Sequence, residues 1–146
     1  MALVFVYGTL RAGEVNDLNE AARRHGLPAP RLVGSGSVPG RLYDFGSYPG
    51  YVPAALEPDS AGLPGGSRVV GDIYEIDEAL IPVLDEIEEV YPGQATLFVR
   101  TEQEVACADG KRRCLLYPVG AEAVRSLPEI EGGDWVAYRR ARVAAG

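Results

Sequence analysis

The apolar positions of this chain fall into short runs separated by glycine and proline. The first run, Ala2 to Val6, is rich in β-branched and aromatic residues and predicts a buried strand over 2–7. The sequence then turns polar through Gly8 and Thr9. Similar runs predict strands at 31–37, 41–45, 51–56 and 68–75. Turns are predicted between them at VPG (38–40), YPG (48–50) and LPGG (63–66).

Three segments carry helical signals. Residues 14–26 predict a loop leading into a short helix, because two arginines and a histidine are followed there by Gly26, a common helix stop. A second helix is predicted over 78–89, with Asp77 as its N-cap and an early Pro82 that favours a tight first turn. Asp134 is predicted to cap a last helix that runs from Trp135 to Val143.

The remaining pattern sets the fold class. Residues 97–107 and 112–118 alternate and predict a hairpin about Asp109-Gly110. The order of elements predicts an α+β fold, with a small mixed, mostly antiparallel β-barrel or sheet flanked by a few short helices. The length of 146 residues favours one domain over 1–146.

The second helix contains one carboxylate out of pattern. With Leu80 at 0° and about 100° per residue, the apolar positions fill an arc from about 300° to about 100°. Asp85 falls outside this arc at about 140°, whereas Glu88 falls inside it at about 80°. Burial of a lone carboxylate is costly but raises its pKa, which suits an acid or base. The alternative is that the helix ends near Ile87 and that Glu88 is a surface residue.

Composition narrows the possible partners. The net charge of −7 argues against nucleic acid, whose binding depends on Lys and Arg. No apolar run approaches the length of a membrane span, and the first run lacks the basic start of a signal peptide, so we expect a cytoplasmic protein without membrane contact. Cys107 and Cys114 either lie opposite each other across the hairpin or are small apolar strand residues in a reducing compartment.

Other catalytic groups are scarce. His25 is the only histidine and is expected at the surface, so Ser-His-Asp and Cys-His arrangements have little support. A zinc site needs more His or Cys ligands than the chain has, and we predict no metal and no organic cofactor. Tyr43 and Tyr117 either line a pocket or are core tyrosines.

Four motifs, in this order, resemble the gamma-glutamylcyclotransferase-like family, especially its small bacterial members and its gamma-glutamylamine cyclotransferase branch. They are VYGTLR near the start, GRLYDFGSYPG at 40–50, GDIYEI at 71–76 and LDEIEE at 84–89. The likeness runs from Val4 to the GDW at 133–135.

The resemblance implies a site made of two parts. The family's Tyr-Gly-[Ser/Thr]-Leu loop holds the carboxylate end of the substrate, mainly through backbone N–H groups, and corresponds here to Tyr7, Gly8, Thr9 and Leu10. The family's catalytic glutamate ends a Leu-Asp-x-x-Glu pattern and corresponds to Glu88, the residue that the helical wheel singles out. The chain departs from the family at three places near this site: Glu89 stands for glycine, the 90–96 loop is long, and Phe98 stands for tyrosine.

The implied reaction is intramolecular. The α-amine of a gamma-glutamyl compound attacks its own γ-amide carbonyl, closes 5-oxoproline and releases an amine, with Glu88 as general acid and base and without a cofactor. Two other functions stay open: a non-catalytic module that binds a small anion or metabolite, and a biosynthetic enzyme that removes a gamma-glutamyl protecting group. The expected partner is a small gamma-glutamyl substrate, and the sequence leaves the oligomeric state open.

Overall fold

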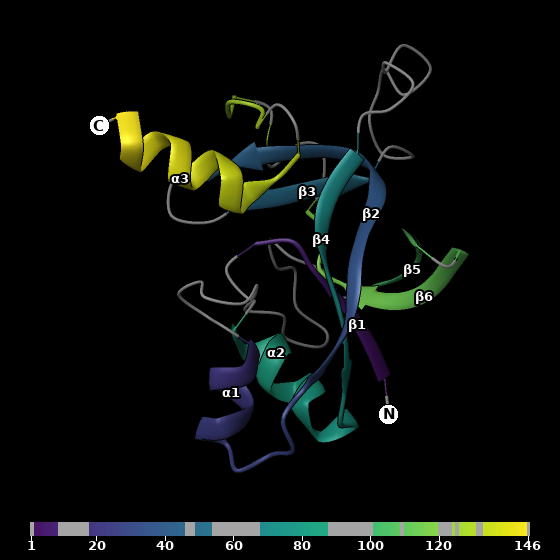
Figure 1. Cartoon of the computed structure of the whole chain (residues 1–146). Helices are drawn as coiled ribbons and strands as arrows, with labels where there is room; N and C mark the ends of the chain where they lie inside the picture. The colour runs from purple at the N-terminus through teal and green to yellow at the C-terminus, as the bar shows by residue number, and fades with distance from the viewer. Residues whose placement is uncertain are drawn as a thin grey trace.

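The chain is described in a computed structural model over residues 2–8, 18–45, 49–53, 68–87, 101–108, 110–119, 124, 126–130 and 133–145. The elements, in chain order, are β1 (Ala2–Val6), α1 (Leu18–Arg24), β2 (Arg31–Asp44), β3 (Pro49–Pro53), β4 (Arg68–Ile76), the 3₁₀ helix η3 (Glu78–Leu80), α2 (Ile81–Ile87), β5 (Thr101–Cys107), β6 (Gly110–Leu116) and α3 (Trp135–Ala145). Figure 1 shows α1 and α2 together at one end of the molecule and α3 at the other.

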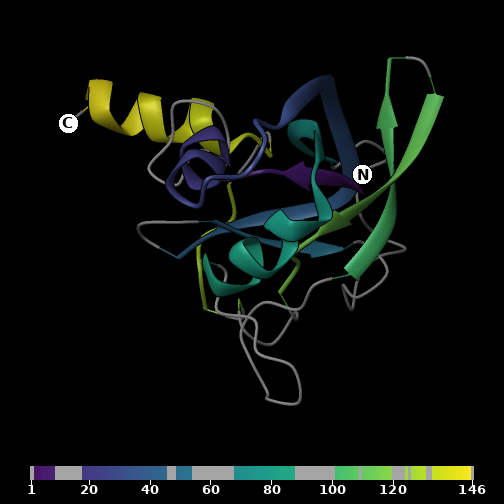
Figure 2. The ribbon, with the colours of Figure 1, turned by 90° about the horizontal axis from the view of Figure 1, so that it is seen from below.

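The strands form a closed barrel with one additional strand. Their order is β3-β2-β4-β1-β6-β5, and a further pairing of β2 with β5 closes the ring, which leaves β3 outside it on β2. β1 and β6 are parallel, and the other pairs are antiparallel. Figure 2 shows the β5–β6 hairpin projecting to one side. The predicted α+β fold with a mixed, mostly antiparallel barrel is confirmed.

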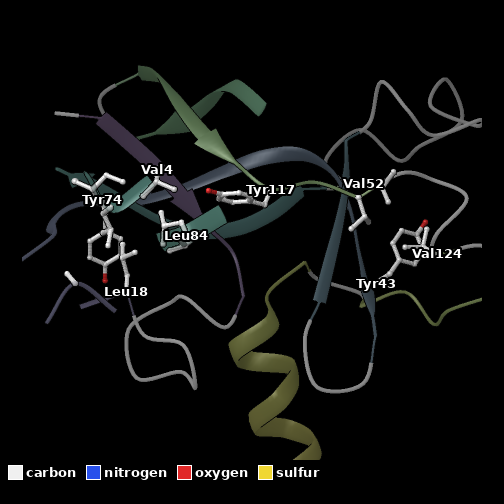
Figure 3. Close-up of a cluster of buried hydrophobic side chains, with 13 residues drawn as sticks. Val4, Leu18, Tyr43, Val52, Tyr74, Leu84, Tyr117 and Val124 are labelled. Atoms are coloured by element: carbon white, nitrogen blue, oxygen red, sulfur yellow. The ribbon is translucent and has the colours of Figure 1, made fainter. Parts of the chain in front are cut away.

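Alternation along β1 separates two apolar clusters. Val4 and Val6 belong to a helix-side cluster, which includes Leu84 of α2 and appears in Figure 3. Phe5 and Tyr7 point to the opposite side, into a second cluster with residues of β2, β4, β5 and β6. Successive side chains of a strand point to opposite faces, so one short strand contributes to both cores.

The turn predicted at 38–40 is wrong, because β2 continues through these residues. β2 pairs with β4 up to Pro39, opposite Arg68, and with β3 from Gly40, opposite Pro53. The proline and glycine therefore mark the point where one long strand exchanges partners. The predicted turns at 48–50 and 63–66 include residues outside the described part of the chain.

The predicted helix ends are confirmed where local hydrogen bonds define them. After α1, the Leu27 N–H donates to the Ala22 carbonyl at 2.9 Å, and Gly26 has φ +66°, the pattern of a Schellman stop. The Asp77 carboxylate accepts the Ala79 N–H at 2.8 Å, and the first turn before Pro82 is the 3₁₀ helix η3. The Asp134 carboxylate likewise accepts the Ala137 N–H at 3.1 Å, at the start of α3.

The hairpin register separates the two cysteines. Cys107 pairs with Gly110, and Cys114 pairs with Gln103, so the two thiols do not face each other and no disulfide joins them. Cys114 is buried among the apolar side chains of the second cluster. This burial, with a smaller contribution from Cys107, raises the pKa of the Cys114 thiol to about 11.

We expect Gly133→Ala to destabilise the fold far more than Gly26→Ala. Both glycines have positive φ, +65° and +66°, so alanine is strained at either place by about 1–2 kcal/mol. A Cβ at Gly26 meets nothing, but at Gly133 it overlaps the Arg68 carbonyl oxygen, which should add about 1–3 kcal/mol. Urea unfolding of both variants measures the difference, and equal losses would contradict the close approach at Gly133.

We expect Cys114 to react slowly with iodoacetamide at pH 8. Thiolate is the nucleophile, and a pKa of about 11 leaves roughly one Cys114 in a thousand ionised at this pH. Because burial favours the neutral thiol, the rate should rise about tenfold per pH unit up to about pH 11. Mass spectrometry of wild type and Cys107→Ala follows the labelling, with circular dichroism to show that the fold persists. Fast labelling of Cys114 at pH 8, with a rate that does not change at higher pH, would contradict the burial of this thiol.

Candidate functional site

The predicted site joins a loop after β1 to the end of α2. Of the loop residues, the structure describes Tyr7 and Gly8, whereas Thr9 and Leu10 lie outside the described residues. α2 is described as far as Ile87, and Glu88, the next residue, also lies outside. The Glu89, 90–96 and Phe98 positions are outside as well. The described residues therefore show the contacts around the start of the loop and around α2, the two elements that carry the predicted site.

The Tyr7 side chain lies in the core. It is 7% exposed, and its hydroxyl donates to the Tyr117 carbonyl at 2.6 Å while accepting the Tyr51 N–H at 3.2 Å. The Tyr51 carbonyl in turn accepts the Val119 N–H at 2.8 Å. These bonds have the slanted pattern of a parallel β-ladder, with the Tyr7 hydroxyl inserted into one rung. The phenol of Tyr7 thus connects β1 to β3 and to the segment after β6.

Gly8 follows directly, and its missing side chain is required by packing. A Cβ on Gly8 would lie 2.7 Å and 2.8 Å from two ring carbons of Pro49, the first residue of β3. The proline ring therefore occupies the space in which any other residue would place its side chain. This contact fixes the start of the loop against β3.

Tyr117 connects this loop to α2. Its side chain is 3% exposed, and its hydroxyl donates to Asp85 Oδ1 at 2.7 Å. Figure 3 shows that hydroxyl directed toward the part of the cluster that contains Leu84. Tyr117 is thus a core tyrosine whose backbone carbonyl bonds to Tyr7 and whose side chain bonds to α2.

Asp85 is the residue that the sequence analysis missed. It lies on α2 with a partly buried side chain, next to the buried Leu84. The helical wheel placed it about 40° beyond the apolar arc and so treated it as solvent-facing. A polar side chain at the border of an apolar arc can still reach a buried donor, and this border position was the available signal.

Tyr51 is held by bonds on both sides. Its hydroxyl donates to the Pro39 carbonyl at 2.9 Å and accepts from Gln103 Nε2 at 3.0 Å. Burial raises the pKa of Tyr51 to about 12, against smaller opposing effects of Gln103 and Arg68. Its ring meets that of Tyr7 edge to face, with centroids 5.7 Å apart. Tyr51 is therefore a neutral, structural neighbour of the loop.

Other chemistry is sparse in the described part of the chain. His25 is exposed just after α1. Among the residues described, no three His, Cys, Asp or Glu side chains are grouped so as to hold a metal ion. None of the helices in these ranges has the length and apolar character needed to cross a membrane.

Comparison with known proteins identifies the family. Residues 4–137 match the family model described as gamma-glutamyl cyclotransferase, AIG2-like, and the chain belongs to this family. Gamma-glutamylaminecyclotransferase of Bos taurus is 34% identical over 121 residues, which are 80% of this chain and 65% of the bovine protein, just under two thirds of its length.

Two further relatives cover more of both chains. Gamma-L-glutamyl-butirosin B gamma-glutamyl cyclotransferase of Niallia circulans is 32% identical over 142 residues, 95% of this chain and 78% of that protein. The crystal structure of an AIG2-like protein from Mus musculus superposes with a TM-score of 0.67 at 28% identity, covering 90% of this chain and 86% of the other.

We expect Tyr7→Phe to destabilise the protein by about 1–3 kcal/mol, because the Tyr51 N–H loses its acceptor and the Tyr117 carbonyl loses a donor, both in the core. Tyr51→Phe is the comparison, since its hydroxyl bonds at a partly buried site, and we expect a smaller loss of about 1 kcal/mol. Guanidinium unfolding gives both values. A Tyr7→Phe variant as stable as wild type would contradict the role of the Tyr7 hydroxyl as a bridge between the Tyr51 N–H and the Tyr117 carbonyl.

Proposed function

We propose that this protein is a gamma-glutamyl cyclotransferase in which Glu88 is the general acid and base. The α-nitrogen of the substrate forms a bond to its own γ-carbonyl carbon, and the bond from that carbon to the amide nitrogen breaks. The products are 5-oxoproline and a free amine. The observation that carries the proposal is family membership across residues 4–137, with Leu84-Asp85-x-x-Glu88 in place.

The proton balance requires one group that can take and return a proton. The α-nitrogen is an ammonium at neutral pH; it loses one proton before it attacks and a second as the lactam N–H forms. The leaving nitrogen gains one proton to depart as an amine and a second to become an ammonium. A single carboxylate between them can do both, a role worth about 10²–10⁴ in rate. The cyclisation is neither oxidative nor dependent on another reactant, so we propose that it needs no cofactor.

Holding the substrate in a curled shape is the other requirement. Orientation of two reacting groups within one molecule can contribute several kcal/mol to lowering the barrier. We propose that the backbone amides of Tyr7, Gly8, Thr9 and Leu10 hold the substrate's carboxylate. Two observations support the backbone as the binding element: the Tyr7 phenol is already bonded in the core, and Pro49 packs against Gly8.

The names of two relatives favour a substrate in which the gamma-glutamyl group is attached to an amine. The bovine relative is a gamma-glutamylamine cyclotransferase, and the Niallia relative acts on gamma-L-glutamyl-butirosin B. We therefore propose a gamma-glutamyl amine as substrate. The Niallia match spans 95% of this chain and supports the second candidate, removal of a gamma-glutamyl group from a biosynthetic product.

We expect the purified protein to release 5-oxoproline from at least one member of a panel of gamma-glutamyl amines, gamma-glutamyl dipeptides and gamma-glutamyl-ε-lysine. Glu88→Gln should lose about 10²–10⁴ in kcat because the amide cannot accept a proton. Chromatography of 5-oxoproline measures both proteins. Glu78→Gln, an exposed glutamate of η3, makes the same change of charge and should leave turnover unchanged.

The outcomes separate the candidate functions. Equal rates for wild type and Glu88→Gln would contradict the role of Glu88. Saturable binding of gamma-glutamyl compounds by wild type, with no 5-oxoproline from any of them, would instead support the non-catalytic module. Turnover confined to gamma-glutamyl derivatives of large amines would favour the biosynthetic enzyme.

A further inference from the structure

We propose that Asp85 and Tyr117 are a positioning pair that fixes the end of α2, and with it Glu88, relative to the Tyr7–Leu10 loop. This inference rests on the proposed function, because it concerns how the two halves of that site are held in register. Neither residue is proposed to touch the substrate. Their effect on the reaction would be exerted through Glu88, which follows Asp85 by three residues.

The pair is anchored at both ends. The Tyr117 hydroxyl donates to Asp85 at 2.7 Å, while the backbone carbonyl of Tyr117 accepts from the Tyr7 hydroxyl at 2.6 Å. Tyr117 itself is buried, and its neighbour Val119 is bonded to Tyr51 of β3. One rigid aromatic residue therefore spans from the residue that begins the loop to the helix that precedes Glu88.

Apolar packing alone would leave α2 less well defined. The helix is seven residues long, and among its described side chains, 81–85, Leu84 is the fully buried one, with the buried Leu80 of η3 just before the helix. Apolar contacts are not directional, so they resist withdrawal of a short helix from the core better than its rotation or sliding. A hydrogen bond has a narrow range of length and angle, so it restricts both the rotation and the sliding of the helix. The Tyr117–Asp85 bond is such a directional contact, and it acts on the residue directly after Leu84.

Small displacements matter for a proton-transfer group. A base must lie within hydrogen-bond reach of the proton that it takes, and an error of about 1 Å can cost on the order of 10² in rate. Loss of the pair should therefore lower kcat. The substrate's carboxylate is assigned to the loop amides, so KM should change little.

The structure offers a matched control. Tyr138 of α3 donates to Asp44 of β2, also at 2.7 Å. Both contacts join a tyrosine to an aspartate on a different element, but α3 lies at the opposite end of the molecule from α2 (Figure 1). Tyr117→Phe and Tyr138→Phe remove the same hydroxyl from equivalent bonds, and only the first bond reaches α2.

The test measures kcat, KM and melting temperature with the best gamma-glutamyl amine. We expect Tyr117→Phe and Asp85→Ala each to lose about 10–100-fold in kcat, with KM within about threefold of wild type. Asp85→Asn keeps an acceptor oxygen and should retain kcat within about threefold. The double variant Tyr117→Phe/Asp85→Ala should lose no more than the worse single variant, because both changes break one bond.

Tyr138→Phe should lower the melting temperature about as much as Tyr117→Phe but leave kcat unchanged. A Tyr117→Phe enzyme with the kcat of wild type would overturn the proposal. So would an equal loss of kcat in Tyr138→Phe, since the effect would then reflect general destabilisation. Failure of Asp85→Asn to retain activity would show that the charge, not the bond, is what matters, and would overturn it too.

A second measurement separates this proposal from the proposed function. Hydrogen exchange followed by mass spectrometry should show faster exchange of the α2 amides in Tyr117→Phe than in Tyr138→Phe. If wild type releases no 5-oxoproline, the proposed function fails, and exchange alone then decides whether the bond positions α2. Unchanged exchange in α2 would overturn the positioning role whatever the activity.

Discussion

The packing of β3 against the segment after β6 depends on the hydroxyl of Tyr7, which bonds to both. This hydroxyl occupies a place where two stretches of backbone, in β3 and after β6, would otherwise face each other with a donor and an acceptor. Buried backbone groups without partners are costly, so the phenol must be in place for both stretches to pack. Since Tyr7 is also the first residue of the predicted substrate loop, the core determines where that loop begins.

The long strand β2 creates the second constraint. It pairs with β4 and β5 within the barrel and with β3 beyond Pro39, and so carries β3 as an extension of the sheet. β3 in turn brings Pro49 against Gly8 and Tyr51 against Tyr7. The exchange of partners at Pro39-Gly40 therefore places β3 where Pro49 packs against Gly8. Proline lacks an N–H and is tolerated where a strand leaves one partner for another.

The features that the sequence predicted correctly are those whose partners lie a few residues away. The stop after α1, the cap at Asp77 and the tight turn before Pro82 each involve backbone groups close along the chain. The turn predicted at 38–40 failed because proline and glycine signal a local bend, whereas β4 and β3 hold this segment extended. The bonds around Tyr117 join residues 110 and 32 positions apart, so no local pattern could predict them. The Glu88 half of the site stays a prediction.

Of the three acidic residues in Leu84-Asp85-Glu86-Ile87-Glu88, we propose that Asp85 and Glu88 have different tasks for a physical reason. A general base must gain and lose a proton in every catalytic cycle, and its hydrogen bonds change as it does so. A group whose hydrogen bonds change during the reaction cannot also hold the helix in a constant position. Under the proposed function, Asp85, whose Oδ1 accepts a hydrogen bond from the buried Tyr117, holds the helix and Glu88 carries out the chemistry. Under this division, the three-residue spacing between Asp85 and Glu88 matters as much as either residue, because it sets how far along the chain the proposed reacting group lies from the fixed Asp85.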